Sequence, residues 1–495
     1  MTDPLKNYVT YEDFGAKGDA ETDDIRAILA AHAYANEHRL PVKTRWDATY
    51  YIGGEACPVP IETDTDWGSS HFVIDDRTAA DNKAPVFLVR SRLSAFTPDI
   101  RTLKKDQDFL PPISDRDCVV YVENHAVKHY IRYGPNVNNG TDQSDVFILR
   151  KGGTIDSPID WDYEEVTKAE AFPVDEEPLT IRGGVFTTIA NQGPSVYNYY
   201  ERNIQITRSN TKVSGLVHYV AGELSHGSPY NGFIRAYLCA DITFEDLFLT
   251  GHKMYFTIGA AGRPVPMGSY DLRAGKVCNF TMKNCRTENI LDRSRWGTIA
   301  TDFCKNIRLD GCRLSRVDTH QGVSGVYELK NSVFGHMGVK AIGRGRILIE
   351  NCTSYGDEFL ELRPDYGSTW DGTIDIRNCR YIPACGEMCT PHILHVQNAG
   401  IHDFGYPCRM GSELRIDGLE ILDDSVPEGY AGPYFCTDPD LPSGYEEGPL
   451  PEIRPFPYVL PDKLFLRNIR SSSGKALRMC ENPQLSEALM KRQEP

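Results

Sequence analysis

Short alternating runs of apolar and polar residues fill the middle of the chain and predict β-strands. Alternate side chains of a strand face opposite sides of its sheet, so each run offers one face to a core and one to solvent. Several runs end on one signature, a polar residue followed by Asn or Gly and then by Cys or Ser, as in Asp310-Gly311-Cys312. The Asn or Gly recurs at positions 284, 311, 331, 351 and 378, at intervals of 27, 20, 20 and 27 residues. Intervals of this length predict the stacked coils of a solenoid.

The residues of this repeated signature have separate expected roles. Asn suits a tight bend, because its side chain tolerates left-handed backbone and can bond along a ladder of neighbours. The small residue after it should point inward, which places Cys285, Cys312 and Cys352 in the core. The chain has 14 Cys, and many unpaired cysteines favour a reducing compartment. We therefore expect a cytoplasmic protein or a component of a phage particle assembled there; a secreted mature form stays open.

An amphipathic helix is predicted ahead of the repeats. Thr22 is a good N-cap and acidic residues follow it, so the helix should begin at about Asp23 and run to His38. The β-branched and aromatic residues from Val42 to Ile52 then predict strands. The apolar positions expected on the buried face of the helix are Ile25, Ile28, Leu29, Ala33 and Tyr34.

The order of glycine turn, capped helix and strands over residues 11–52 resembles the N-terminal motif of the pectate-lyase-like superfamily. In that superfamily a short helix covers the open end of a coil stack and hides its unpaired backbone. Later stretches such as Tyr130–Gly134 and Asp365–Trp370 are similar to uncharacterised bacterial and phage members. The resemblance implies an all-β fold, a right-handed parallel β-helix with an N-terminal capping α-helix. We expect the cap and first strands at 1–55, the β-helix at 56–425, and a Pro/Gly-rich excursion with a last coil or C-terminal cap at 426–495.

Charge and hydropathy remove two classes of partner. The chain of 495 residues has 69 acidic and 53 basic side chains, for a formal charge of -16. A surface of this sign does not suit nucleic acid. No apolar run approaches the roughly 18 residues that a membrane helix needs, and residues 1–7 lack the apolar core of a secretory signal. We therefore expect neither a nucleic-acid nor a membrane partner.

The repeat register predicts a file of charged side chains on the outside of the solenoid. Counted from the Asn or Gly of each coil, Arg293, His320 and Lys340 all lie nine residues on. On the next coil Glu361 and Arg363 lie ten and twelve residues on. Strands on neighbouring coils lie about 4.8 Å apart, so we expect these side chains to stack in one file.

Other polar and aromatic residues flank the predicted file, as a carbohydrate groove requires. Aromatic rings stack on sugar faces while polar groups bind hydroxyls and carboxylates. Asp318, two residues before His320, could orient the imidazole. The further candidates are Asp365, Tyr366, Trp370 and Asp371 beyond the file, and His252, Tyr255, Asp271 and His336 on nearby coils.

Two cleavage chemistries and one binding role fit these residues. The resemblance implies a groove like that of polysaccharide lyases, glycoside hydrolases and phage depolymerases. Elimination from a uronate is slightly favoured: Arg363 and Arg293 would neutralise the carboxylate, His320 or Lys340 would be the base, and Tyr366 or His320 the acid. The alternatives are a glycan-binding appendage and hydrolysis by paired carboxylates. The carboxylates available for hydrolysis are Asp318, Glu361, Asp365 and Asp371.

No cofactor is expected, although calcium assistance and a homodimer or homotrimer stay open. The calcium-binding carboxylates of the alkaline lyases do not precede Lys340. Cys385, Cys389, His392 and His395 have donor types that suit zinc, but their spacing is unusual, so metal is the minority interpretation. The acidic aromatic stretch 158–165 reads as an exposed insertion that could wall the groove.

Overall fold

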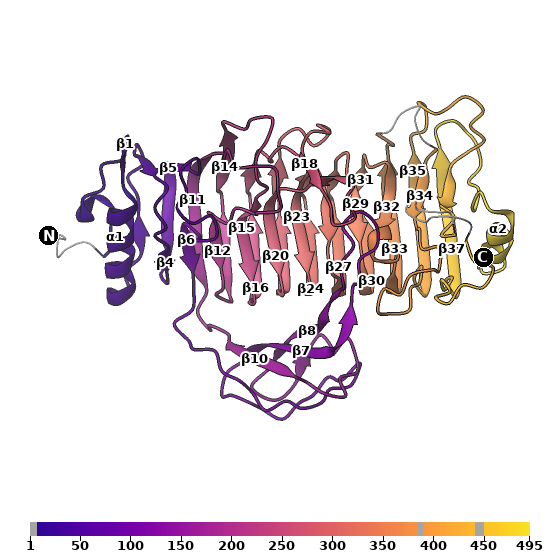
Figure 1. Cartoon of the computed structure of the whole chain (residues 1–495), viewed down its shortest axis with the longest axis horizontal. Coiled ribbons are helices and arrows are strands. Elements are labelled where there is room, and N and C mark those ends of the chain that lie inside the picture. The colour runs from indigo at the N-terminus through magenta and orange to yellow at the C-terminus, as the bar shows by residue number, and fades with distance from the viewer. Residues whose placement is uncertain (1–6, 385–389, 441–449) are drawn as a thin grey trace.

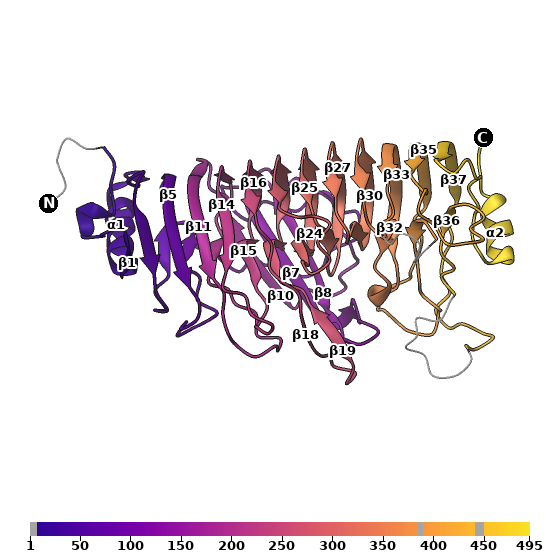
Figure 2. The ribbon, with the colours of Figure 1, turned by 90° about the horizontal axis from the view of Figure 1, so that it is seen from above.

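The computed structural model describes residues 7–384, 390–440 and 450–495, and the described strands wind into a parallel β-helix. Figures 1 and 2 show the coils side by side along one axis. Two sheets carry the coils, a long sheet of 20 strands and a second sheet of 11 among the described residues. The predicted right-handed parallel β-helix with an N-terminal helix is confirmed.

Parallel pairing between coils defines both sheets. In the long sheet Tyr327 pairs with Ile347 and Leu329 with Ile349, one coil apart. The strands of the long sheet are β1 (Asp19–Asp23), β2 (Val42–Lys43), β3 (Thr49–Ile52), β5 (Thr65–Asp75), β11 (Leu179–Ile189), β13 (Thr211–Ser214), β14 (Val217–Ala221), β16 (Ala240–Glu245), β17 (Phe248–Leu249), β21 (Cys278–Lys283), β22 (Arg286–Thr287), β24 (Cys304–Asp310), β25 (Arg313–Leu314), β27 (Val323–Lys330), β28 (Val333–Phe334), β30 (Gly343–Glu350), β31 (Thr353–Ser354), β33 (Trp370–Tyr381), β35 (Glu413–Ile421) and β37 (Lys463–Ser471). The strands of the second sheet are β4 (Val59–Ile61), β6 (Phe87–Val89), β12 (Ile204–Ile206), β15 (Asn231–Tyr237), β20 (Tyr270–Gly275), β23 (Gly297–Asp302), β26 (Val317–Thr319), β29 (Val339–Ala341), β32 (Glu358–Leu362), β34 (His392–His395) and β36 (Tyr434–Cys436).

The repeated signature forms the bends of the long sheet, as predicted. Asn284, Gly311, Asn331, Asn351 and Asn378 all have positive φ, between 49° and 65°. The Asn351 amide donates to the Asn331 side-chain oxygen at 3.2 Å, so the ladder exists. The cysteines that follow are buried, and every cysteine in the described residues is unpaired.

Asn351 offers a test of this ladder. Replacement by Ala should lower the free energy of unfolding by about 2 kcal/mol, because it removes one side-chain hydrogen bond and places a Cβ-bearing residue at φ 54°. Replacement by Gly removes the same hydrogen bond but tolerates the backbone. In denaturant unfolding, the wild-type protein should therefore be the most stable, the Gly variant less stable and the Ala variant the least stable. An Ala variant as stable as the Gly variant would show that the left-handed bend costs nothing here.

The capping helix α1 (Ile25–His38) starts later than predicted, and Thr22 is not its N-cap. The Asp19 carboxylate accepts from the Thr22 backbone N–H, which lies in β1, and the cap position falls to Asp24. The prediction of Ala33 on the buried face is also wrong, because this side chain is exposed. The residues of α1 that are buried are Ile25, Ile28, Ala31, His32, Ala35 and Asn36.

Residues 90–178, called the insertion here, leave the coils between β6 and β11. They form a four-stranded antiparallel sheet of β7 (Cys118–His129), β8 (Thr141–Leu149), β9 (Ile155–Asp156) and β10 (Lys168–Pro173). Figure 1 shows it below the coil stack. Ile159 and Tyr163 are buried in its core, so the stretch 158–165 is not simply exposed. The buried Lys305 of β24 pairs with Asp145 of the insertion at 2.9 Å and fastens it to the coils.

Further elements close the stack and its edges. Helix α2 (Pro483–Met490) follows the last coil, and its N-cap Asn482 accepts from two backbone N–H groups. Strands β18 (Tyr255–Ile258) and β19 (Pro264–Met267) form a separate hairpin, and short 3-10 helices lie at Glu12–Phe14 and Pro364–Tyr366. None of the described helices has the length and apolar character needed to cross a membrane. The three-part division of the chain stays a prediction.

Candidate functional site

A groove of about 630 Å³ lies over the second sheet, from β20 to β32, and is called the groove below. The strands of this sheet carry a column of residues in register with one another, of which all but the buried Asp318 line the groove. In chain order this column consists of Arg273, Ala300, Asp318, Lys340 and Glu361. The described residues that line the groove include five cations and three carboxylates: Arg132, Arg273, Arg316, Lys340, Arg363, Asp302, Glu361 and Asp365.

The predicted pairing of His320 with Lys340 is wrong by two residues. Lys340 pairs with Asp318, and His320 lies just past the end of β26. The cause is loop length, because the segment from the Gly or Asn to the strand is two residues longer in the coil of Lys340. The predicted neighbours Lys340 and Glu361 are in register and form an ion pair.

Arg363 lies between Asp365, which lines the groove, and Asp318, which is fully buried beneath it. Its Nη1 donates to both oxygens of Asp318, at 2.8 and 2.7 Å, and its Nε and Nη2 donate to Asp365 at 3.0 and 2.7 Å. Arg132, from the loop after β7, donates to Asp365 from the other side at 2.9 Å. Burial raises the pKa of Asp365, but Arg363 and Arg132 outweigh it and hold the pKa far below its usual range. All three nitrogen atoms of the buried Arg363 guanidinium are thus hydrogen-bonded to carboxylates.

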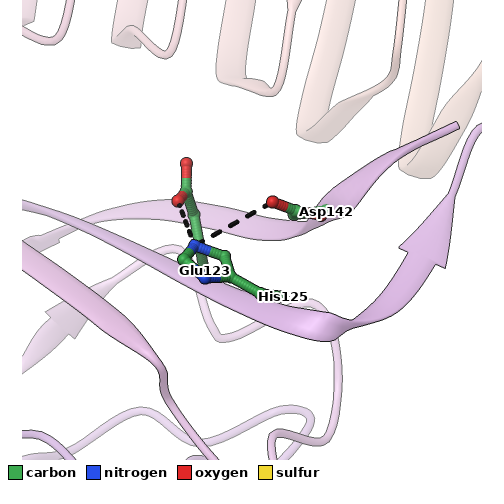
Figure 3. Close-up of side chains that lie close together, drawn as sticks. All are labelled: Glu123, His125 and Asp142. Carbon is green, nitrogen blue, oxygen red and sulfur yellow. Dashed lines mark hydrogen bonds and ion pairs between the residues drawn. The ribbon is translucent and has the colours of Figure 1, made fainter.

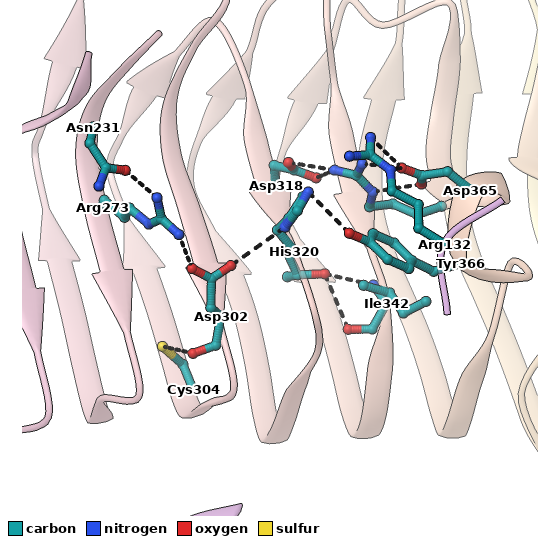
Figure 4. Close-up of polar contacts among 12 residues, drawn as sticks. Arg132, Asn231, Arg273, Asp302, Cys304, Asp318, His320, Ile342, Asp365 and Tyr366 are labelled. Atoms are coloured by element: carbon teal, nitrogen blue, oxygen red, sulfur yellow. Dashed lines mark hydrogen bonds and ion pairs between the residues drawn. The ribbon is translucent and has the colours of Figure 1, made fainter. Parts of the chain in front are cut away.

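His320 lies between Asp302 of the preceding coil and Tyr366 of a later one (Figure 4). Its Nδ1 is 3.6 Å from an Asp302 oxygen, and its Nε2 is 3.3 Å from the Tyr366 hydroxyl. Burial lowers the pKa of His320 below its ordinary value, while Asp302 opposes the shift. Burial raises the pKa of Asp302, but Arg273 and His320 outweigh it and bring the pKa to about 2. At neutral pH the site therefore holds a neutral imidazole beside an ionised carboxylate.

Asp302→Asn should lower the pKa of His320 further. The change removes the negative charge that favours the imidazolium and leaves Arg273 without its carboxylate partner, and both effects disfavour a second positive charge. Histidine NMR titration of the folded protein measures the shift. An unchanged or raised pKa would mean that Asp302 does not act on the imidazole.

Five tyrosine and tryptophan rings line the groove beside these charges: Tyr133, Tyr197, Tyr199, Tyr270 and Trp296. Tyr199 and Tyr270 are parallel, with ring centroids 6.4 Å apart, and Arg316 lies over Trp296 at 4.8 Å. Tyr197, Tyr199, Trp296 and Asp302 were not predicted to lie in the groove. The run of tyrosines at 197–200, in a polar segment between strands, was the signal that could have found two of them.

Residues 130–140, called the bridging loop, connect β7 and β8 and border the groove. On one side the Tyr133 N–H donates to the Asp365 carbonyl at 2.9 Å. On the other, the Ala261 N–H of the β18–β19 hairpin donates to the Pro135 carbonyl at 3.0 Å, and the Asn136 amide donates to the Tyr197 hydroxyl at 2.9 Å. The loop therefore ties the two walls of the groove together. Sequence spacing could not predict it, because Arg132 and Asp365 lie 233 positions apart.

No protein-family model matches the chain, and none of the curated proteins matches it. Solved structures do match. The tailspike of Pseudomonas phage phi297 is 11% identical, over 94% of this chain and 80% of that chain, with a TM-score of 0.49. The tailspike of Pseudomonas phage LKA1 is 13% identical, over 93% of this chain and 81% of that chain, with a TM-score of 0.47. The surface adhesin PfbA of Streptococcus pneumoniae is 12% identical, over 95% of this chain and 93% of that chain, with a TM-score of 0.45. Similarity at this level concerns the fold alone.

Four predicted site residues lie away from the groove. The prediction of Arg293 in the charge file is wrong, because its side chain is exposed on a loop and pairs with Asp357 at 3.1 Å. His336 is buried outside the groove and contacts the Arg295 carbonyl at 2.8 Å. Trp370 is fully buried in the core, so it has no face for a sugar. Asp371 lies in a separate cavity.

The candidate residues on earlier coils, and Tyr366, also lie elsewhere than predicted. His252 is buried and its Nδ1 lies 3.2 Å from a Glu223 oxygen, while Tyr255 and Asp271 are buried as well. These three residues therefore do not face the groove. Tyr366 is fully buried, so its hydroxyl reaches His320 but has no open path to a substrate.

Two groups of residues in the sequence have side chains of the types that bind metals. Cys385 and Cys389 lie outside the described residues, whereas His395 pairs with Glu358 at 3.1 Å. Glu123, His125 and Asp142 lie close together on the insertion (Figure 3). The ammonium of Lys128 pairs with Asp142 and that of Lys168 lies 3.9 Å from Glu123, so neighbouring lysines already compensate these carboxylates.

Proposed function

We propose that the groove binds an acidic glycan and cleaves it by β-elimination, with His320 as the base. The observation that carries the proposal is the protonation pattern of the groove. Asp302, Asp318 and Asp365 all have pKa values below the ordinary range, so none of them is a protonated acid near neutral pH. Burial lowers the pKa of His320, so its imidazole is neutral near neutral pH, as a general base must be.

Binding of an acidic glycan is supported by the excess of cations and by the aromatic rings. Lys340 and Arg273 are half-buried and stand in one column, three strand spacings or about 14 Å apart. His320 belongs to the coil between them, so either cation could neutralise a uronate carboxylate beside the base. Tyr197 and Tyr199 would stack against neighbouring sugars.

The proposed step uses one proton carrier. With the Nδ1–H directed at Asp302, Nε2 of His320 is the basic nitrogen. When the uronate is bound, Nε2 leaves its 3.3 Å contact with the Tyr366 hydroxyl and takes the proton from C5. The electron pair of that C–H bond forms the C4–C5 double bond, and the bond from C4 to the leaving oxygen breaks. The imidazolium, stabilised by Asp302, then returns the proton to the leaving oxygen. Tyr366 would position the imidazole, and no step passes through a metal.

A glycan panel tests the proposal. Uronate-containing polysaccharides such as polygalacturonate, alginate and hyaluronan are incubated with the protein, and ultraviolet absorbance of an unsaturated uronate is followed together with reducing ends. Absorbance that rises with reducing ends supports elimination. Reducing ends without absorbance would contradict elimination and indicate hydrolysis. Binding without either signal would contradict both and indicate a glycan-binding appendage.

The unpaired cysteines of the described residues also support the proposal of a reducing compartment.

A further inference from the structure

A second cavity, of about 280 Å³, lies between the insertion and the coils of β30 and β33. It shares no described lining residue with the groove. Its charged lining residues are Lys105 of the insertion, Arg344 of β30, Asp371 of β33 and Arg409 ahead of β35. Three cations thus face one carboxylate, in a chain whose formal charge is -16. Such a local excess of positive charge suits an anionic ligand.

The guanidinium of Arg344 is short of hydrogen bonds. Its nitrogen atoms lie 3.7 Å from Asp371, 3.8 Å from Asp160 and 4.0 Å from Asp106, all beyond hydrogen-bond distance. Its Nη1 is buried and has no hydrogen-bond partner among the described residues. The side chain is only 13% exposed. A buried guanidinium normally has its donors bonded. Nε and Nη2 of Arg344 reach carboxylates only at 3.7 Å or more, so they are the donors left for an acceptor in the cavity.

Arg409 repeats this pattern from a different coil. Its Nη1 donates to Asp371 at 3.2 Å, but its Nε is buried without a partner in the described part of the chain. Lys105 also pairs with Asp371, at 3.5 Å. The single carboxylate is therefore shared by three cations, and two guanidinium groups that border one cavity retain unused donors. A carboxylate accepts from such donors more strongly than a neutral group does.

Aromatic rings form the remaining wall. Trp161 of the insertion and Tyr406 are nearly parallel, at 24°, with ring centroids 6.3 Å apart, and both border the cavity. Tyr130 meets Tyr406 edge to face at 5.1 Å. Flat apolar faces beside cationic donors are the surroundings that a carboxylated sugar requires. A cavity of 280 Å³ suits one sugar ring better than a chain of them.

We propose that this cavity is a second binding site for a uronic acid unit. Arg344 and Arg409 bind its carboxylate, and Trp161 and Tyr406 contact its ring. The inference stands on the cavity's own contacts and does not require the groove to be catalytic. A protein with both sites would hold an acidic glycan at a point beyond the groove.

Fluorine NMR of the protein labelled with 5-fluorotryptophan tests the second site. The chain has 5 Trp, so Trp161 reports on this cavity and Trp296 on the groove within one spectrum after assignment by Trp→Phe variants. The probes are sodium glucuronate, neutral glucose and sodium acetate. We expect glucuronate to shift the Trp161 resonance at concentrations where glucose and acetate do not. Arg344→Gln and Arg409→Gln should each abolish this shift.

Arg346→Gln is the matched control, because Arg346 lies on the same strand, is about half exposed and does not border the cavity. It should keep the Trp161 shift. Equal shifts of the Trp161 resonance with acetate and glucuronate would overturn the assignment to a sugar. An unchanged Trp161 resonance in the wild-type protein would overturn the site, and this outcome does not depend on the folding of a variant. A shift of Trp296 without one of Trp161 would refute the second site while supporting the groove. Cleavage without a Trp161 shift would do the same.

Discussion

Arg363→Met should lower the free energy of unfolding by about 3–5 kcal/mol, the usual cost of removing one partner from a buried ion pair. Arg363 is 7% exposed and binds both oxygens of Asp318 and both of Asp365. Methionine keeps much of the volume but leaves two carboxylates with one cation fewer. Arg316 would still pair with Asp318, and Arg132 with Asp365. Denaturant unfolding of the two proteins measures the difference.

Arg293→Met is the matched control for this effect. Arg293 also pairs with an aspartate, but its side chain is 57% exposed. Exposed pairs contribute about 0–1 kcal/mol, so this variant should unfold almost as the wild type does. Equal losses in the two variants would contradict the claim that burial makes Arg363 important.

His320→Gln should reduce glycan cleavage by about 10²–10⁴-fold, the range expected for loss of a general base. Glutamine can still fill the space between Asp302 and Tyr366, so binding and the melting temperature should change little. Initial rates on the substrate found in the glycan panel, with binding measured separately, test this prediction. His336→Gln is the control, because His336 lies outside the groove and should leave the rate unchanged.

The pH dependence of cleavage provides a second readout for His320. The base acts when neutral, and burial keeps the pKa of His320 below its ordinary value. Activity should therefore persist as pH falls below the ordinary histidine range, and it should be lost when the imidazole finally takes a proton. An acid limb at or above the ordinary range would point to a different base.

Local spacing predicted the stacked coils because each coil repeats the same physical problem, whereas the right-handed parallel β-helix was what the family resemblance implied. A tight bend needs a residue such as Asn351 that accepts positive φ, and the position after it needs a small inward side chain such as Cys352. Both signals lie within a few residues of each other. The insertion carries no such repeat. Its attachment to the coils joins Lys305 and Asp145, which are far apart in sequence, so this attachment could not be predicted.

The candidate site was predicted in part for the same reason. His320, Lys340, Glu361, Arg363 and Asp365 were expected near one another, and all five line the groove. Their pairing was wrong where loops differ in length by two residues. Counting residues also gave no measure of burial, so the expectation that Arg363 is an open substrate contact missed its two carboxylate partners.

Trp370 and Asp371 were misassigned by a related error. The polar segment that follows Arg363 reads as a loop beside the groove, but it ends at Trp370, the first residue of β33. The indole therefore enters the core, and Asp371 faces the second cavity. Only the path of the backbone between the two sheets decides which side of the coil such residues face.

Mass spectrometry of glycan products formed in heavy-oxygen water tests the central claim most directly. Elimination by His320 adds no water, so the account predicts an unsaturated end that is one water lighter than a hydrolysis product and carries no heavy oxygen. Saturated products with one heavy oxygen at the new end would contradict it.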